Sequence, residues 1–385
     1  MTTTAALIYL DNNATTRPAP EVVAAMLPFY TEHWGNPSSL HQFGRDCATA
    51  LDTARSQVAA LLCVTRASQL VFTSSGTEAD NLALHALCTA QPDKKHVVTT
   101  AVEHSAHVRY CRMLAERGYD ITTLPVDRTG QLDVAALAAA LRDDTACVAI
   151  MWSNNETGVC FPIAEIAALC VKKNIPLHVD AVQAAGKIPI DVERVPVTTL
   201  AISGHKIHAP KGVGALYVRR GTPFRAMLLG GGQEHGRRSG TENVAQIVGL
   251  GVAAQLAQSH LSQVASAVGA LRDQLERGLL ANIPRARVNG ATCERAPNTT
   301  NMSIPGVDGE GLILALSQAG VAASTGSACS QGSTEPSHVL VAMHLSPEDL
   351  RGTLRLSLSR ETTAEEIAQA LEIIPRVVAE RRSLS

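Results

Sequence analysis

The sequence lacks an excess of charge of either sign, since 33 Lys and Arg residues are matched by 35 Asp and Glu residues in a chain of 385 residues. Binding to nucleic acid or to an anionic membrane usually needs a basic surface, so we expect neither partner and favour small-molecule chemistry or a protein partner. No apolar run approaches the roughly 18 residues that a membrane span requires, and residues 1–10 lack the basic start and long apolar core of a signal peptide. These absences predict a soluble, cytoplasmic protein.

The sequence also lacks a CxxC pair, and its nine cysteines are an odd number. Both features are typical of reduced thiols in a reducing compartment, so we expect no structural zinc or other metal, and a chain of this length needs no disulfides. Most cysteines, such as Cys147, lie in apolar runs and are interpreted as inert core residues. Cys329 differs, because residues 324–333 are small, polar and punctuated by glycine, a pattern that predicts a mobile loop with an exposed thiol.

Residues 70–220 alternate short β-branched runs with longer helical ones. This alternation predicts an α/β fold in which helices cover a mostly parallel central sheet and ligands bind at the carboxyl ends of the strands. The expected strands are residues 70–73, 96–102, 121–126, 146–153, 176–182, 198–203 and 214–218, and the expected helices are residues 78–88, 107–117, 134–142 and 163–173.

The pattern changes near residue 260, after the start of a long helical stretch over residues 242–280. We therefore predict a large α/β domain of residues 15–259 and a small α+β domain that combines residues 1–14 with residues 260–385 and carries the Cys329 loop. The expected strands of the small domain are residues 301–304 and 353–359, and its expected helices are residues 309–319 and 363–381.

Lys206 closes the run Ser-Gly-His-Lys behind an apolar stretch that starts at residue 198, and an amine at that position is able to form an imine with a carbonyl cofactor. Asp180 and Gln183 follow another apolar stretch upstream. Pyridoxal phosphate needs a carboxylate for its ring nitrogen, a lysine as covalent anchor and hydroxyls for its phosphate. Taken singly, Asp180 could cap a helix and Lys206 could be a solvated lysine, but together they predict a pyridoxal phosphate site.

The run of residues 72–81 passes from an expected strand through a tight turn into an expected helix. Backbone amides at that helix start and the Thr77 hydroxyl would face a phosphate, although a plain N-cap with Glu78 is the alternative. The glycine run of residues 230–238 lacks the Lys and hydroxyl of a P-loop, and residues 249–254 have no preceding strand, so both are poor nucleotide sites. The basic segment that ends near Thr241 could instead contact a phosphate in a neighbouring subunit.

Three further polar residues follow or lie within expected strands. His104 could stack on a pyridine ring and move protons, or could be a capping or core histidine, and no third ligand supports a zinc site with His107. Asn155 could bind a substrate carboxylate or simply form a turn. Arg355 suits bidentate capture of a carboxylate, or lies on a solvated strand face.

These motifs resemble those of the cysteine desulfurases, which are pyridoxal phosphate enzymes of the class V aminotransferase fold, within fold type I. The resemblance covers nearly the whole chain, including residues 9–16 (YLDNNATT), residues 36–41 (NPSSLH) and the C-terminal strand. The loop Gly-Ser-Ala-Cys at residues 326–329, followed by Glu-Pro-Ser-His at residues 335–338, is most similar to the nitrogen-fixation type, with the housekeeping type close to it.

The resemblance also implies roles for individual residues in a homodimer. His235 departs from it, since many relatives have arginine there, which affects any contact made by that side chain but not the core chemistry. By resemblance, Lys206 holds the cofactor as an aldimine, Asp180 pairs with the pyridinium nitrogen, Gln183 binds the ring oxygen and His104 stacks on the ring. The resemblance implies that the phosphate is held by Gly76, Thr77, Ser203 and His205, together with Thr241 of the other subunit. It also implies that Asn155 and Arg355 orient the substrate carboxylate and that Cys329 is the nucleophile.

The implied reaction converts L-cysteine to L-alanine and leaves a persulfide on Cys329, which supplies an iron–sulfur scaffold or another sulfur acceptor, with nitrogenase cluster assembly as the favoured destination. A housekeeping iron–sulfur role or sulfur supply for tRNA modification is the alternative within the family. A selenocysteine lyase or an aminotransferase on the same fold, or a sulfur-relay protein that has lost catalysis, are the competing hypotheses. An aminotransferase needs no thiol in a loop, so the segment around Cys329 argues against it.

Overall fold

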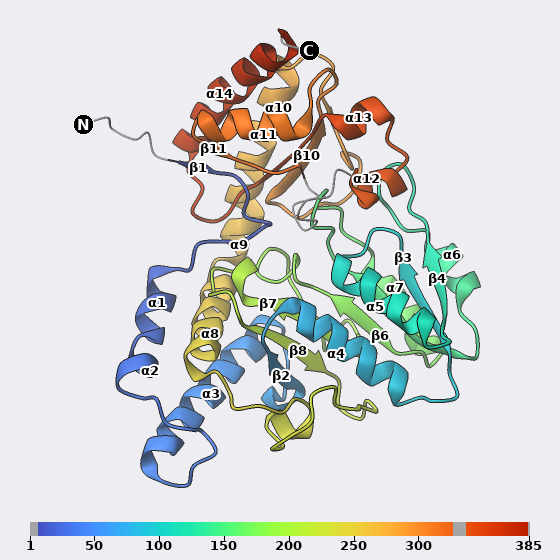
Figure 1. Ribbon diagram of the computed structural model, residues 1–385, viewed down its shortest axis with the longest axis vertical. Coiled ribbons are helices and arrows are strands. Elements are labelled where there is room, and N and C mark those ends of the chain that lie inside the picture. Colours follow the sequence, from blue (N-terminus) through green and yellow to red (C-terminus); the bar gives the residue numbers. More distant parts are fainter. Residues whose placement is uncertain (1–6, 326–335, 384–385) are drawn as a thin grey trace.

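The computed structural model describes residues 7–325 and 336–383. Its largest feature is a seven-stranded sheet in the order β2-β8-β7-β6-β5-β3-β4 (Figure 1). Neighbouring strands from β7 to β4 run parallel, and only β8 is antiparallel to its two neighbours β7 and β2. The strands are β2 (Leu70–Thr73), β3 (His96–Thr100), β4 (Asp120–Leu124), β5 (Thr145–Met151), β6 (Leu177–Asp180), β7 (Thr199–Ser203) and β8 (Gly214–Val218).

Helices cover both faces of this sheet, because successive side chains of a strand point to opposite sides. In β2, Leu70 and Phe72 join the core that also contains apolar side chains of α3 and α8, whereas Val71 packs with Leu82 of α4 on the other face. The helices around the sheet are α1 (Pro20–Met26), α2 (Pro28–Thr31), α3 (Gln42–Leu61), α4 (Gly76–Thr89), α5 (Ser105–Glu116), α6 (Val134–Ala140), α7 (Ile163–Lys172) and α8 (Val244–Ser259).

A second apolar core lies in the upper part of Figure 1 and combines the first described residues with the C-terminal part of the chain. Ile8 and Leu10 belong to this core, and β1 (Ile8–Tyr9) pairs in parallel with β11 (Val321–Ala322). The other elements of this part are an antiparallel sheet of β9 (Arg287–Val288), β10 (Thr299–Ser303) and β12 (Thr353–Ser357), and helices α9 (Leu261–Gln263), α10 (Gly269–Asn282), α11 (Gly309–Gln318) and α14 (Ala364–Ser383). Two later helices, α12 (His338–Ala342) and α13 (Pro347–Arg351), instead pack Leu340 and Leu350 against the core of the seven-stranded sheet.

One expected helix differs from the structure, and a long helix of the structure was not expected. The continuous stretch expected over residues 242–280 is divided, since α8 ends at Ser259 and a π-helical turn, Val264–Val268, precedes α10. Helix α3 was not predicted at all, although its one buried stripe, with Leu51, Ala54 and Val58, packs along α8. No helix within residues 7–325 and 336–383 is both long enough and apolar enough to span a membrane.

Candidate active site

A cavity of about 250 Å³ opens at the carboxyl ends of β6 and β7. Asp180 is the last residue of β6 and Ser203 is the last residue of β7, so the parallel pairing of these strands brings both to the same edge. Lys206 closes the short 3₁₀ helix, Gly204–Lys206, that follows β7. Ten of the residues singled out in the sequence line this cavity: Gly76, Thr77, His104, Asn155, Asp180, Gln183, Ser203, His205, Lys206 and Arg355.

The two remaining predicted site residues are Thr241 and Cys329. Thr241 is exposed and lies outside the cavity lining, and Cys329 lies outside the described residues. The cavity wall also contains Asn13 and Asp80, to which the sequence analysis assigned no role. Their presence in two of the quoted runs, residues 9–16 and 72–81, was the only signal that pointed to them.

The Lys206 amine is held against the wall of the cavity by the N-terminal segment. Its Nζ donates hydrogen bonds to the carbonyl oxygen of Asn13 at 2.5 Å and to that of Ala14 at 2.8 Å. Burial, and then the neighbouring cations of Lys206 and Lys211, lower the pKa of His205 to about 4. His205 is therefore a neutral imidazole at neutral pH, with one N–H to donate and one nitrogen to accept.

Asp180 is a buried carboxyl group whose surroundings disfavour its charge. Burial, and then the negative charge of Asp80, raise the pKa of Asp180 to about 7. Its Oδ1 accepts the backbone N–H of Val182 at 2.8 Å. A cationic ring nitrogen placed against this carboxyl group would offset both unfavourable effects.

Behind Asp180 lies a buried network of two imidazoles and two carboxylates. Oδ1 of Asp80 is 3.3 Å from Nε2 of His178 and 3.4 Å from Nε2 of His107, whose Nδ1 is 3.1 Å from Oε2 of Glu103. Burial alone would lower the pKa of His107, but the carboxylates of Asp80 and Glu103 raise it well above its ordinary value. The side-chain atoms of Asp80, His107 and His178 that could bind a metal ion lie within 4.8 Å of one another. His107 thus has possible metal-binding partners, but they come from distant parts of the sequence. Hydrogen bonds link His107 to Glu103 and His178 to Asp80, and the ion-pair contact between His107 and Asp80 joins these two pairs, so we interpret the four groups as a charge network.

The Asp180→Asn variant is expected to change how stability depends on pH. The pKa of an aspartate in the unfolded chain is about 3.9, whereas the pKa of folded Asp180 is about 7. Between these two pH values, the unfolded state therefore loses a proton that the folded state keeps. The wild-type protein without ligand should therefore lose unfolding free energy relative to the variant as pH rises through this window, and the difference should level off above it. Urea denaturation at several pH values, with the exposed Asp143→Asn as control, measures the difference. A difference that does not vary with pH would contradict the assignment.

The start of α4 forms the floor of the cavity beside Ser203. The Ser75 hydroxyl caps the helix by accepting the backbone N–H of Glu78 at 3.1 Å. The plain N-cap is thus present, and it leaves Gly76 and Thr77 on the cavity wall. A Cβ at Gly76 would lie 2.8 Å from Cγ2 of Val182, so only glycine lets the helix start approach this edge of the sheet. The partial positive charge at the amino end of a helix favours a phosphate at this position.

His104 both caps a helix and lines the cavity. Its Nδ1 accepts the backbone N–H of Ala106 at 3.2 Å at the start of α5. The capping role and the cavity role, which the sequence left as alternatives, are therefore combined in one side chain.

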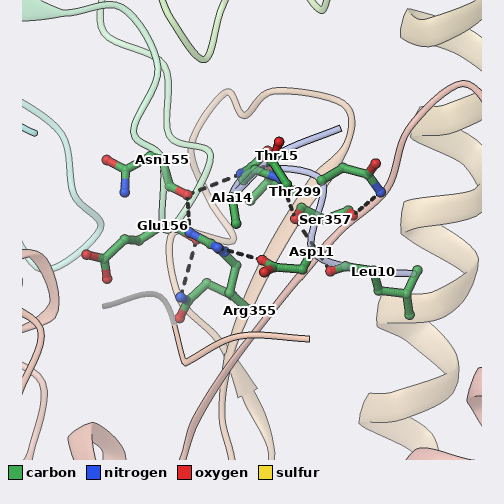
Figure 2. Close-up of polar contacts among 12 residues, drawn as sticks. Leu10, Asp11, Ala14, Thr15, Asn155, Glu156, Thr299, Arg355 and Ser357 are labelled. Atoms are coloured by element: carbon green, nitrogen blue, oxygen red, sulfur yellow. Dashed lines mark hydrogen bonds and ion pairs between the residues drawn. The ribbon is translucent and has the colours of Figure 1, made fainter. Parts of the chain in front are cut away.

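Arg355 is buried within the strand β12, with an exposed fraction of 2%, so the alternative of a solvated strand face is wrong. Figure 2 shows its guanidinium between Asp11 and Asn155, where Nη2 lies 2.7 Å from Oδ1 of Asp11 and Nη1 donates to the carbonyl oxygen of Asn155 at 3.0 Å. The Nε of Arg355 is buried and has no hydrogen-bond partner among the described residues. The guanidinium thus keeps an unused donor at a cavity that it lines.

These features fit pyridoxal phosphate. The cavity combines an oriented lysine amine, a buried carboxyl group whose charge burial and Asp80 disfavour, and the amino end of a helix for a phosphate.

The comparisons with known proteins agree with this fit. Residues 8–370 match the family described as Aminotransferase class-V, and the chain belongs to this family. Cysteine desulfurase NifS of Azotobacter vinelandii is 51% identical over 378 residues, which cover 98% of this chain and 94% of that protein. A cysteine desulfurase of Trichormus azollae is 52% identical over 379 residues, with the same coverage of 98% and 94%.

Solved structures show the same fold. A structure titled "NIFS-LIKE PROTEIN" has a TM-score of 0.90 and 36% identity, covering 97% of this chain and 100% of that one. A structure titled "SspA in complex with cysteine" has a TM-score of 0.81 and 33% identity, covering 91% and 98% of the two chains. The expected family, the mostly parallel α/β fold and the dependence on pyridoxal phosphate are confirmed.

Proposed function

We propose that the protein is a cysteine desulfurase that converts L-cysteine to L-alanine and transfers the sulfur to Cys329. The observation that carries this proposal is the meeting of Lys206, Asp180 and Arg355 at one cavity, with both described ends of the Cys329 segment attached beside it. The relatives that are about half identical over nearly the whole chain are named cysteine desulfurases.

The attachment of the Cys329 segment supports a short path from its thiol to the cavity. On one side, the carbonyl oxygen of Ser324 accepts the backbone N–H of Arg355 at 2.6 Å. On the other side, the imidazole of His338 lies 2.9 Å from the carbonyl oxygen of Glu103, the residue before His104. Cys329 is four residues beyond Thr325, so chain connectivity limits the distance between their Cα atoms to about 14 Å.

Four of the other cysteines are poor candidates for the nucleophile, since a thiol attacks as its thiolate. Burial raises the pKa of Cys111 and Cys160 to about 11 and that of Cys170 to about 12. Burial and then Asp191 raise the pKa of Cys63, which is exposed. These thiols stay protonated at neutral pH.

The ten predicted residues that line the cavity each have a proposed task toward cofactor or substrate. Bound pyridoxal phosphate withdraws electrons from the α-carbon of an amino acid attached to it. Lys206 anchors the cofactor and then moves protons at the substrate carbons. The carboxylate of Asp180 pairs with the ring nitrogen and Gln183 donates to the ring oxygen. The phosphate is bound by Gly76, Thr77, Ser203 and His205, the ring is covered by His104, and the substrate carboxylate is bound by Asn155 and Arg355.

The sulfur transfer needs no external oxidant. The Cys329 thiolate attacks the substrate sulfur, so that a sulfur–sulfur bond forms while the carbon–sulfur bond breaks. The electron pair of the broken bond stays with the substrate carbon, which takes up a proton and becomes the methyl group of alanine. The proposed products are therefore alanine and a persulfide on Cys329.

The Gln183→Ala variant is expected to keep measurable activity. The substitution removes one hydrogen bond to the ring oxygen, worth roughly 1–3 kcal/mol, rather than the anchor itself. Alanine formation should fall between about fivefold and 150-fold, since about 1.4 kcal/mol corresponds to a factor of ten. Steady-state assays of alanine against L-cysteine concentration measure the loss, and complete inactivity would contradict the limited role of Gln183.

The decisive test of the function combines spectrum and products. Purified protein with pyridoxal phosphate should show a visible absorption band that changes when L-cysteine is added, and alanine and sulfide should form in the presence of a thiol reductant. Formation of a keto acid instead would indicate an aminotransferase, and a marked preference for selenocysteine would indicate a selenocysteine lyase. Absence of the band would favour a relay protein without catalysis.

A homodimer completes the proposal. Large apolar side chains are exposed on and near α1 and α2, including Leu27, Trp34 and Leu40. These two helices lie at the left of Figure 1. Thr241, which is exposed and lies outside the lining of its own cavity, would contribute its hydroxyl to the cavity of the partner subunit. Light scattering during size-exclusion chromatography tests for the mass of two chains.

The destination of the sulfur is proposed as an iron–sulfur scaffold or another acceptor protein, in nitrogenase cluster assembly. The similarity to NifS of Azotobacter vinelandii supports this choice. A cytoplasmic location is supported by the eight described cysteines, all of which are free. We further propose that residues 15–259 hold the cofactor, while residues 1–14 and 260–385 form the unit that carries the Cys329 segment.

A further inference from the structure

A second lysine lies directly behind the cavity. Lys187 is buried, and its amine contacts two side chains of the cavity wall. Its Nζ donates to Oε1 of Gln183 at 2.5 Å and to Oδ1 of Asn13 at 3.1 Å. Lys187 therefore contacts two residues that line the cavity but does not itself line it.

The surroundings favour an uncharged amine at this position. Burial, followed by the cations of Lys206 and Arg355, holds the pKa of Lys187 well below its usual range. A neutral amine has two N–H donors, which match the two oxygen acceptors in number. Such an amine satisfies both oxygens without adding a second positive charge beside Lys206.

Lys187 determines which way the Gln183 amide faces. The Gln183 oxygen accepts from Lys187, while its Nε2 donates to the carbonyl oxygen of Asn13 at 3.0 Å, the same oxygen that accepts from Lys206. A reversed amide would take the acceptor Oε1 away from the Lys187 N–H and place it against the carbonyl oxygen of Asn13, so that two acceptors would face each other. The NH₂ group of Gln183 is thereby kept on the side of the Lys206 amine.

Lys187 also helps to fix Asn13. The Asn13 side chain accepts from Asn298 at 3.0 Å, donates to the hydroxyl of Thr299 at 2.8 Å and donates to the carbonyl oxygen of Asn155 at 3.2 Å. One residue of the N-terminal segment thus joins the Lys206 anchor to the elements that hold the substrate-binding residues. Loss of the amine would remove the donor to Oε1 of Gln183 and leave Oδ1 of Asn13 with the Asn298 amide as its donor.

We propose that Lys187 is a positioning residue, whose buried amine orients the Gln183 amide and the Asn13 side chain so that Gln183 presents its NH₂ group to the ring oxygen of the cofactor. This inference rests on the proposed function, in which Gln183 makes that contact. Lys187 itself touches neither cofactor nor substrate in this arrangement.

The test replaces Lys187 with methionine, which has a similar length and no N–H donor. The affinity for pyridoxal phosphate, measured by equilibrium titration, should fall about tenfold, a change of about 1.4 kcal/mol. The pH midpoint of the visible band of the bound cofactor should also shift, because the hydrogen bond to the ring oxygen is lost. The exposed Lys172→Met is the matched control and should leave both quantities as in the wild type.

A double-mutant cycle separates positioning from general structural support. In the Gln183→Ala background, Lys187→Met should change the cofactor affinity and the pH midpoint by much less than in the wild type, because the side chain through which it acts is absent. A crystal structure of the ligand-free Lys187→Met variant should show the Gln183 amide in a new orientation. Lys187→Gln, which keeps an N–H donor, should restore part of the affinity and serves as the test variant if the methionine variant does not fold.

The outcomes distinguish this inference from the proposed function. Equal effects of Lys187→Met in both backgrounds, or an unchanged affinity and pH midpoint in a folded variant, would overturn the positioning role while the wild type still forms alanine and persulfide. Failure of the wild type to bind pyridoxal phosphate would overturn the proposed function together with the inference.

Discussion

Replacing Lys206 with alanine is expected to abolish turnover of L-cysteine and to remove the visible absorption band of the bound cofactor. The physical reason is that this amine is both the covalent anchor and the group that moves protons at the substrate carbons. The carbonyl oxygens of Asn13 and Ala14 hold the Lys206 amine at the cavity. The alanine side chain has no amine and therefore forms no imine with the cofactor. Absorbance spectra and alanine assays of purified variant and wild type measure both losses.

A lysine outside the cavity provides the control for this experiment. Lys173 is exposed at the end of α7, and Lys173→Ala should keep both the absorption band and the activity. Thermal unfolding of the two variants should establish that each is folded. Alanine formation by Lys206→Ala at a rate close to that of the wild type would show that the anchor is a different residue.

Replacing Cys329 with alanine is expected to separate cofactor binding from sulfur transfer. The groups proposed to bind pyridoxal phosphate remain, so the variant should keep the visible band and its response to L-cysteine. The persulfide should disappear, because the cysteines with raised pKa values, such as Cys111 and Cys160, carry little thiolate at neutral pH. Mass spectrometry after incubation with L-cysteine detects the persulfide, and sulfide release gives the rate.

The control for Cys329 is Cys63, whose thiol is exposed. Cys63→Ala removes the exposed cysteine whose pKa is raised by burial and by Asp191, and this variant should form persulfide as the wild type does. Sulfide release by Cys329→Ala at the wild-type rate would refute the assignment of the nucleophile.

The sheet could be predicted well because its strands are short apolar runs between amphipathic helices. The expected strand of residues 214–218 coincides with β8, and the expected helix of residues 163–173 differs from α7 by one residue. The segment before residue 70 gave no such signal. Helix α3 has only one buried stripe and depends on packing along α8, nearly two hundred residues later in the chain, so local periodicity did not reveal it.

Part of the cavity could be predicted because motifs that follow parallel strands meet at one edge of the sheet. Asp180 and Lys206 are examples, since each follows the end of a strand. Lys187 and Asn13 were missed for the opposite reason. Lys187 belongs to no motif that distinguishes it from an ordinary turn residue. Its significance comes from the contact with Asn13, which is 174 residues away in the sequence.

The sequence by itself determined the alternation of strands and helices, the order of the reactive groups along the chain and the family to which the chain belongs, because these are properties of local pattern and residue identity. Only the tertiary structure decided which groups are buried together. The pKa of Asp180 is about 7 and the pKa of Lys187 is well below its usual range, because burial removes water from each group and neighbouring charges act on it. Those charges, such as that of Arg355 near Lys187, come from segments far apart in the chain, so no local pattern contains them.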